Sequence, residues 1–167
     1  MATSSSGVDT RLYRDVCGCF ATGVTVVTTA DESGGRGLTA NAISSLSLEP
    51  ALFLVCVDLR ATSYPILEQA GHFAINILAA DQEDVSSFFA GTTPDDNPMG
   101  GIQHRMSEYG NPLLDNALAY LECRTHSVID GGDHKIFVGE VQGCHIERPD
   151  AEPLLFFRGK YREIAQQ

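Results

Sequence analysis

The sequence predicts a mainly β protein, an antiparallel barrel decorated by two or three helices. About seven segments are rich in β-branched and apolar residues, and Gly, Pro, Asn and Asp separate them. Two long segments, about 117–129 and 134–146, are joined by the turn sequence Asp130-Gly-Gly-Asp133, a strong hairpin signal. Only two or three stretches have helical spacing, so the strands must carry the architecture.

The length of 167 residues suggests one domain. Apolar residues make up 43% and charged residues 20%, which is typical of a globular protein. We expect residues 1–8 to form a disordered tail and residues 9–167 to form a single domain.

The first expected element is a helix over about 10–20. Leu12, Val16, Cys19 and Phe20 lie at helical spacing, which predicts that they form its buried face. Gly23 ends this pattern, and strands are then expected over about 24–29 and 37–43 because β-branched and apolar residues dominate there.

The middle of the chain continues with a strand over 51–57, whose unbroken apolar run predicts burial on both faces. Thr62 or Ser63 caps a short helix that ends at Gly71. A further strand is expected over 72–78, where apolar residues again dominate.

The last third begins with a helix over about 81–90, with Val85, Phe88 and Phe89 turned inward. Residues 91–112 are rich in Gly, Pro, Asn and Asp, and a loop of this length suggests a lid or a binding segment. After the long hairpin, residues 154–162 suggest one last short strand.

Charge and missing motifs exclude several classes of function. The formal net charge of −11 repels phosphate backbones, which disfavours nucleic acid as a partner. No apolar run approaches a membrane span, and the N-terminus does not resemble a secretory signal. The five cysteines include no CxxC spacing and suggest a reduced, cytoplasmic protein. Neither a dinucleotide-binding glycine motif nor a metal-ligand spacing is found, so a dinucleotide would have to share the barrel's own site.

Residues 39–47 are the first candidate site. Their side chains include several hydroxyls and an amide but no charge, which suits a flat heteroaromatic ring or a phosphate. The alternative is a polar turn whose hydroxyls satisfy their own backbone.

The segment from Asp58 to Ser63 is the second candidate. Arg60 supplies positive charge, and Thr62 and Ser63 stand at the start of a helix, where an anion such as a phosphomonoester is favoured. The alternative is an ordinary helix cap.

The third candidate is the hairpin tip around Gly132, Asp133 and His134. Glycine lets the backbone approach a ligand closely, and histidine can donate a hydrogen bond or stack on a ring. The alternative is an exposed turn histidine.

Four segments together resemble the flavin reductase-like family, which includes reductase components of two-component flavin-dependent monooxygenases. They are Phe20–Thr29, Gly37–Asn41 with Ser44–Ser47, Phe73–Leu78 and Gly132–Val141. The resemblance covers about residues 11–162. It implies a split β-barrel of the antiparallel, Greek-key, FMN-binding type, usually a homodimer with the flavin near the subunit interface. It also implies FMN or FAD as flavin, NADH or NADPH as hydride donor, and a separate oxygenase that receives reduced flavin.

The resemblance assigns roles to matching positions. It implies that Thr39, Asn41, Ser44 and Ser45 line the isoalloxazine and ribityl chain, and that Arg60, Thr62 and Ser63 hold the flavin phosphate. Backbone around Phe73 to Asn76 would support the other edge of the ring. In the segment Gly132, Asp133 and His134, the histidine would contact or position the nicotinamide as the catalytic residue.

Cys19 departs from the family pattern, because relatives often carry a basic or larger residue there, which leaves the cofactor preference open. Two other hypotheses remain. One is a different flavoenzyme on the same fold, such as an oxidase of the pyridoxamine-phosphate type or a reductase of a metal-bound substrate. The other is a non-catalytic flavin-binding protein.

Overall fold

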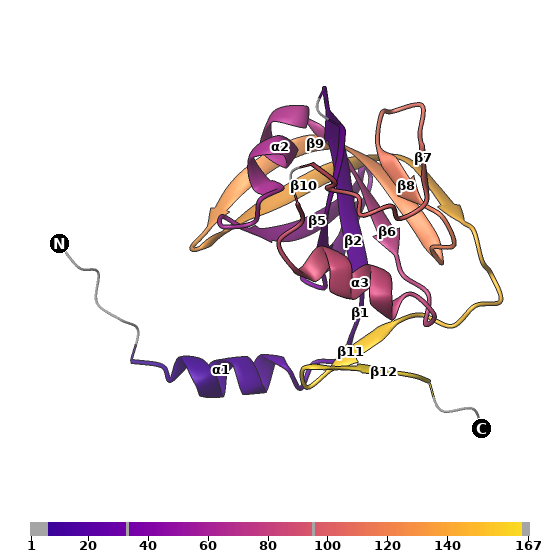
Figure 1. The fold of residues 1–167 in the computed structure, drawn as a ribbon. Helices are drawn as coiled ribbons and strands as arrows, with labels where there is room; N and C mark the ends of the chain where they lie inside the picture. Colours follow the sequence, from indigo (N-terminus) through magenta and orange to yellow (C-terminus); the bar gives the residue numbers. More distant parts are fainter. Residues whose placement is uncertain (1–6, 33, 95, 165–167) are drawn as a thin grey trace.

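The computed structural model describes residues 7–32, 34–94 and 96–164 (Figure 1). Its helices are α1 (Thr10–Cys17), α2 (Tyr64–Ala70) and α3 (Glu83–Ala90). Its strands are β1 (Thr22–Gly23), β2 (Thr25–Asp31), β3 (Gly34–Ala40), β4 (Ile43–Leu48), β5 (Ala51–Asp58), β6 (His72–Ile77), β7 (His104–Met106), β8 (Pro112–Leu114), β9 (Ala119–Gly131), β10 (His134–Ile146), β11 (Leu155–Phe157) and β12 (Lys160–Arg162).

Seven strands form one antiparallel sheet in the order β3-β2-β6-β9-β10-β5-β4. Its two edge strands, β3 and β4, follow each other in the sequence with only Asn41 and Ala42 between them. Two residues span about 7 Å, so the sheet must curl until its edges approach each other. The result is a barrel with a seam at β3, which confirms the predicted fold class.

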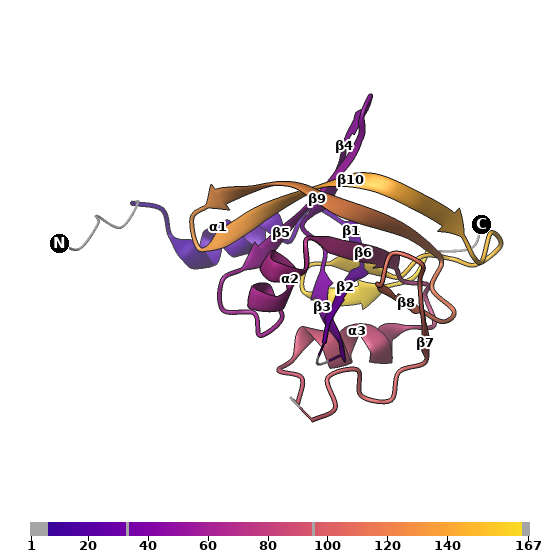
Figure 2. The same ribbon diagram turned by 90° about the horizontal axis from the view of Figure 1, so that it is seen from above.

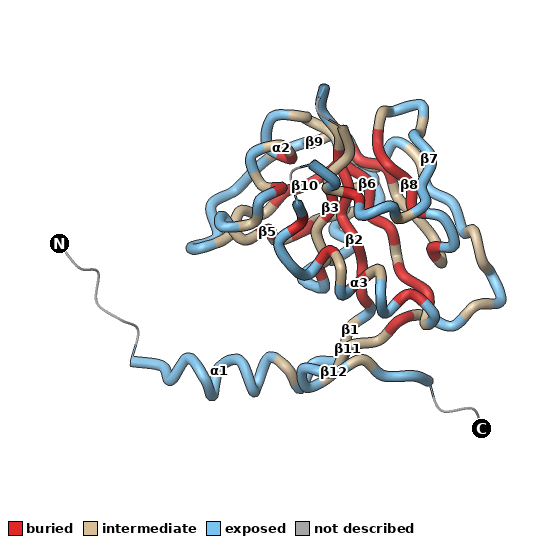
Figure 3. The backbone as a smooth tube through the Cα atoms, in the orientation of Figure 1, coloured by how far each residue is buried: buried red, intermediate tan, exposed pale blue. Residues whose placement is uncertain are grey.

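The barrel interior holds one apolar cluster and the outer face of β2 holds a second. The first includes Val27, Val57, Phe73 and Phe137 and is covered by Leu67 of α2. The second lies on the opposite face of β2 and is covered by α3, with the small sheet β1-β11-β12 beside it. Figure 3 shows the buried residues concentrated in these strands. The two helices therefore cover opposite faces of the same strand.

The local turn signals are confirmed by the structure. β9 and β10 pair along almost their whole length around the predicted glycine turn, and the hairpin runs across the molecule (Figure 2). Helix α2 ends at Gly71, whose φ of 72° is left-handed and favours glycine there. Helix α3 turns the buried Phe89 inward as expected.

Helix α1 forms, but the prediction that its apolar face is buried is wrong. None of its residues is buried, and Leu12, Val16 and Phe20 are between 60% and 78% exposed. Figures 1 and 3 show why, because α1 extends away from the barrel. Helical spacing identified an apolar face but could not say what that face contacts.

Three further segments contain more strand than the sequence suggested. Residues 43–48 form β4, which projects from the body in Figure 2, although a loop was expected there. The predicted lid over 91–112 contains β7 and leads into β8, and the last segment divides into β11 and β12. Of the predicted tail 1–8, residues 1–6 lie outside the described residues. No helix in the described ranges has the length and apolar character needed to cross a membrane.

Candidate functional site

A cavity of about 240 Å³ opens at the barrel seam. One wall is the edge of β3, the opposite wall comes from β5 and the turn into α2, and the end of α3 closes a third side. The lining residues are Gly37, Leu38, Thr39, Ala40, Asn41, Ala42, Cys56, Asp58, Ala61, Thr62, Ser63, Phe89, Ala90, Gly91 and His134.

The free edge of β3 gives this cavity its polar backbone groups. Within the described residues β3 pairs with β2 alone, so on its other side alternate N–H and C=O groups stay unpaired. Gly37 to Thr39 therefore offer backbone donors and acceptors to the cavity that they line, whereas the Ala40 carbonyl accepts from Thr25 Oγ1 at 2.6 Å. Such backbone groups suit the polar edge of a flat heteroaromatic ring.

Side chains around this edge have fixed orientations. The Thr39 Oγ1 hydroxyl donates to the Ser86 carbonyl oxygen at 2.7 Å, and the Asn41 Nδ2 amide donates to Thr22 Oγ1 at 3.1 Å. A Cβ atom on Gly37 would lie 2.6 Å from the Phe89 ring, so glycine at this position lets α3 pack directly on β3.

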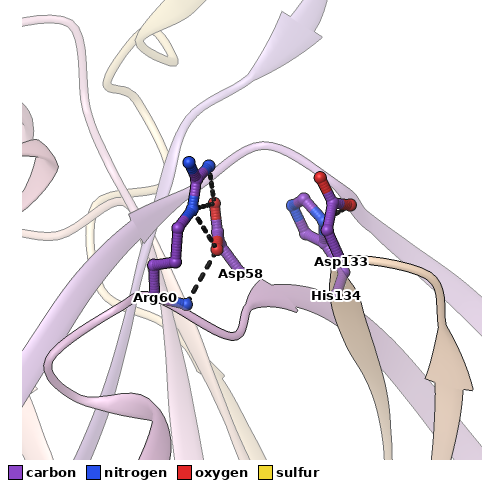
Figure 4. Close-up of polar contacts among 4 residues, drawn as sticks. All are labelled: Asp58, Arg60, Asp133 and His134. Carbon is purple, nitrogen blue, oxygen red and sulfur yellow. Dashed lines mark hydrogen bonds and ion pairs between the residues drawn. The ribbon is translucent and has the colours of Figure 1, made fainter. Parts of the chain in front are cut away.

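Four charged or titratable residues gather at the hairpin tip and the end of β5 (Figure 4). Asp58 accepts from Arg60 Nη2 at 2.7 Å and from the Arg60 backbone N–H at 2.8 Å. These hydrogen bonds lower the pKa of Asp58 below its ordinary value and raise the pKa of Arg60. The Arg60 side chain is 82% exposed, so its charge stands at the rim with one carboxylate already bound to it.

His134 lines the cavity and contacts the second carboxylate of this group. Its Nδ1 lies 2.7 Å from Asp133 Oδ1, which places the Nδ1 proton toward the carboxylate and leaves Nε2 as the second nitrogen for a ligand. The hydrogen bond from His134 lowers the pKa of Asp133. The Leu59 N–H donates to the Asp133 carbonyl at 3.1 Å and ties the hairpin tip to the turn before α2.

The structure brings together most of the predicted site residues. Those that line the cavity are Thr39, Asn41, Thr62, Ser63 and His134. Arg60 and Asp133 stand beside it through their bonds to Asp58 and His134. Residues from three separate segments therefore meet at one place.

Ser44, Ser45 and Gly132 do not line the cavity. The two serines are exposed on β4, where Ser44 Oγ donates to the Ser45 carbonyl oxygen at 2.9 Å. Gly132 is exposed at the hairpin tip with a φ of 79°, which identifies a turn position. Its backbone conformation explains the glycine without a ligand.

Phe73 and Asn76 do not line this cavity, and their assignment as cofactor-binding residues stays a prediction. Both are completely buried, and Phe73 belongs to the barrel interior. The Asn76 amide donates to the Val26 carbonyl and to Thr28 Oγ1, and its carbonyl accepts from the Leu114 N–H. β6 pairs with β2 on one side and β9 on the other, so its backbone has no free edge either.

Several lining residues were missed by the sequence reasoning. Gly37, Phe89 and Gly91 come from β3 and α3, and no local pattern indicates that α3 packs against the seam. Asp58 and Cys56 end the buried strand that precedes the Arg60 segment, so position in that strand was the available signal. Among the described residues no group of three His, Cys, Asp or Glu side chains could hold a metal ion.

Known proteins with similar sequences belong to one family. Residues 17–165 match the family model of the flavin reductase like domain. The reductase subunit HsaB of a flavin-dependent monooxygenase from Mycobacterium tuberculosis is 39% identical over 161 residues, which cover 96% of this chain and 85% of the relative. The FMN reductase (NADH) SmoA from Agrobacterium fabrum is 35% identical, and the match covers 96% of this chain and 90% of SmoA.

Solved structures agree with the sequence matches. The NADH:FAD oxidoreductase SgcE6 of Streptomyces globisporus C-1027 superimposes with a TM-score of 0.90 at 38% identity and covers 99% of both chains. A second structure of the same oxidoreductase, in complex with NAD and FAD fragments, has a TM-score of 0.89.

Proposed function

Because the chain belongs to the flavin reductase-like family, we propose that it uses NADH or NADPH to reduce FMN or FAD and supplies the reduced flavin to a separate flavin-dependent monooxygenase. The observation that carries the proposal is the seam cavity, where the free edge of β3, the hydroxyls before α2 and His134 face one space. These groups fit the polar ring edge, the phosphate end and the hydride donor of such a reaction.

The residues of this chain bind and orient the flavin and the nicotinamide. The chemistry of hydride transfer between them belongs to the cofactors themselves. We assign ring contacts to the β3 edge with Thr39 and Asn41. We assign the flavin phosphate to the Thr62 and Ser63 hydroxyls, with Arg60 at the rim. Backbone N–H groups held by a strand need no reorganisation when negative charge develops on a ring beside them.

His134 is the residue that we assign to the hydride donor. The Asp133 carboxylate fixes its ring through Nδ1, so Nε2 can donate or accept a hydrogen bond without the ring turning. No proton has to come from the protein for the hydride step, so His134 acts by orienting the nicotinamide.

The choice between the flavins and between the nicotinamide nucleotides is part of the proposal's test. SmoA is named an FMN reductase that uses NADH, and SgcE6 is named an NADH:FAD oxidoreductase. We therefore expect NADH as the donor.

A homodimer in the cytoplasm is the assembly that we propose. Helix α1 has eight residues and no buried side chain, and a helix this short is not stable alone in water. Its apolar face, and the exposed Leu46 and Leu48 on β4, suit a second copy of the chain. The five cysteines are all free in the structure, which supports a reducing compartment.

The test is a matrix of two flavins against two nicotinamide nucleotides. Purified protein is mixed with micromolar FMN or FAD and excess NADH or NADPH, and nucleotide absorbance is followed under air, with flavin omitted as the control. Fast oxidation that needs flavin is the expected result, and the four combinations give both preferences. Oxidation that is no faster with flavin than without it, in every combination, would overturn the proposal.

A further inference from the structure

A chain of hydrogen bonds connects the cavity to the C-terminal strand. The Tyr161 hydroxyl on β12 lies 2.8 Å from Ser86 Oγ on α3. The carbonyl oxygen of the same Ser86 accepts from Thr39 Oγ1 at 2.7 Å, and Thr39 lines the cavity. Ser86 is completely buried, so its two polar groups depend on these protein partners. β12, α3 and β3 are thereby joined at one residue.

This series of hydrogen bonds determines that the Thr39 hydroxyl can only accept a hydrogen bond from a ligand. A hydroxyl carries one proton, and that of Thr39 is directed to the Ser86 carbonyl, so only oxygen lone pairs remain for a ligand in the cavity. A phosphate or carbonyl oxygen has no hydrogen to offer such a group. An N–H or O–H group on the ligand does, and it can bond to Thr39 without breaking the bond to Ser86.

We propose that Tyr161 and Ser86 are positioning residues that hold Thr39 as a hydrogen-bond acceptor for an N–H or O–H group of the flavin. The proposal rests on the flavin reductase function proposed above. Tyr161 acts at a distance, because its hydroxyl holds Ser86 and with it the part of α3 that carries the acceptor carbonyl. The close contact between Gly37 and Phe89 leaves α3 little room to shift without changing the cavity wall.

Two kinds of flavin N–H or O–H group could donate to the Thr39 oxygen, and they differ in the oxidation states in which they are present. The ring N3–H and the ribityl hydroxyls are present in both states, whereas the N5–H is present only in the reduced ring. Affinities measured separately for oxidised and reduced flavin therefore distinguish the sources. Equal losses in both states identify N3–H or a ribityl hydroxyl, and a loss confined to the reduced state identifies N5–H or, in the neutral reduced ring, N1–H.

The experiment is a double-mutant cycle read by flavin affinity. Flavin is titrated into wild type, Thr39→Val, Tyr161→Phe and the double variant, in air and in an anaerobic series with reduced flavin. Loss of one hydrogen bond is expected to weaken binding about tenfold in Thr39→Val, and a displaced acceptor about threefold in Tyr161→Phe. Because Tyr161 acts through Thr39, the double variant should bind no worse than Thr39→Val alone.

Controls separate positioning from general damage. Thr39→Ser keeps the hydroxyl and should bind like wild type, and Tyr109→Phe, which removes a hydroxyl away from the cavity lining, should have no effect. Ser86→Ala removes the hydroxyl that bonds to Tyr161, so its flavin affinity should match that of Tyr161→Phe. If one of these two variants folds poorly, the other still tests the proposal.

The proposal would be wrong if the double variant lost flavin affinity by the product of the two single losses. It would also be wrong if Thr39→Ser bound flavin as weakly as Thr39→Val. A wild type that binds no flavin in either state would instead contradict the proposed function itself. The two failures are therefore distinguishable in the same set of titrations.

Discussion

His134 shares its small space with two carboxylates, yet only one of them bonds to it. Asp133 accepts from Nδ1, whereas Asp58 is taken up by Arg60 (Figure 4). The histidine ring is thus oriented from the solvent side, and its remaining nitrogen is available to the cavity that it lines. Orientation by a carboxylate partner is a property of the adjacent pair Asp133 and His134 that the structure shows.

Replacing His134 by alanine should impair use of the hydride donor while flavin still binds. One hydrogen bond to a polar ligand contributes about 1.5–3 kcal/mol when charge is involved, so kcat/KM for NADH should fall about 10- to 100-fold. Steady-state kinetics and flavin titration measure the two effects separately. Unchanged NADH kinetics in this variant would contradict the role given to His134.

The five cysteines should label in an order set by their surroundings. Burial, together with the neighbouring Glu122 carboxylate, raises the pKa of Cys123 to about 12, so its thiol stays protonated and unreactive. Cys17, Cys19 and Cys144 are exposed, and Cys56 lines the cavity. Iodoacetamide at about pH 8, read by mass spectrometry, should modify the exposed Cys144 and spare Cys123 until the protein unfolds.

Cys56 adds a ligand test to the same experiment. Saturating FMN or FAD should slow its modification, because the flavin would occupy the cavity that Cys56 lines. Cys144, which does not line the cavity, is the internal control. Flavin that binds yet leaves the Cys56 rate unchanged would place the ligand elsewhere.

At the scale of elements, the contact between α3 and β3 sets the shape of the seam. Gly37→Ala would place a methyl group 2.6 Å from the Phe89 ring, which must move. Overpacking of this kind costs about 1–3 kcal/mol of unfolding free energy, and the displaced α3 should also weaken flavin binding.

Gly23→Ala is the matched control for that substitution. It also lies in a strand, but a Cβ there would meet nothing within 4 Å. Urea denaturation and flavin titration measure both variants. If Gly37→Ala behaved like Gly23→Ala, the packing of α3 would not control the cavity.

The sequence predicts well those elements that are determined by residues close to one another in the chain. The β9–β10 hairpin follows from its glycine turn, and α2 ends at Gly71 because a left-handed residue is needed there. The exposure of the apolar face of α1 and the pairing of β4 could not be predicted, because both depend on what lies nearby in space. The complete burial of Phe73 and Asn76 could not be predicted for the same reason, since a polar or aromatic residue in a strand segment does not reveal which face it occupies.

In the whole molecule, the position of the seam follows from the order of strands in the sheet. A barrel whose first and last strands follow each other in sequence must bring them together, and the connection at Asn41 and Ala42 lies in the cavity wall. Motif residues scattered over a hundred positions meet there. The sequence could indicate the motifs separately, whereas their meeting at one site depended on closure of the sheet.

The exposed face of α1 leads to the last prediction, which concerns assembly. Burying a leucine contributes about 1.5–3 kcal/mol, and in a two-fold dimer every interface substitution acts twice. Leu12→Lys should therefore weaken the proposed dimer by at least about 100-fold and shift it toward monomer at micromolar concentration.

Size-exclusion chromatography with light scattering measures the assembly across a dilution series. Met106→Lys, which changes a similarly exposed apolar residue on β7, should leave the proposed dimer intact. A wild type that stays monomeric at tens of micromolar would contradict the dimer, and α1 would then need another partner to cover it. Dissociation in both variants would show instead that the loss of assembly is not specific to the face of α1.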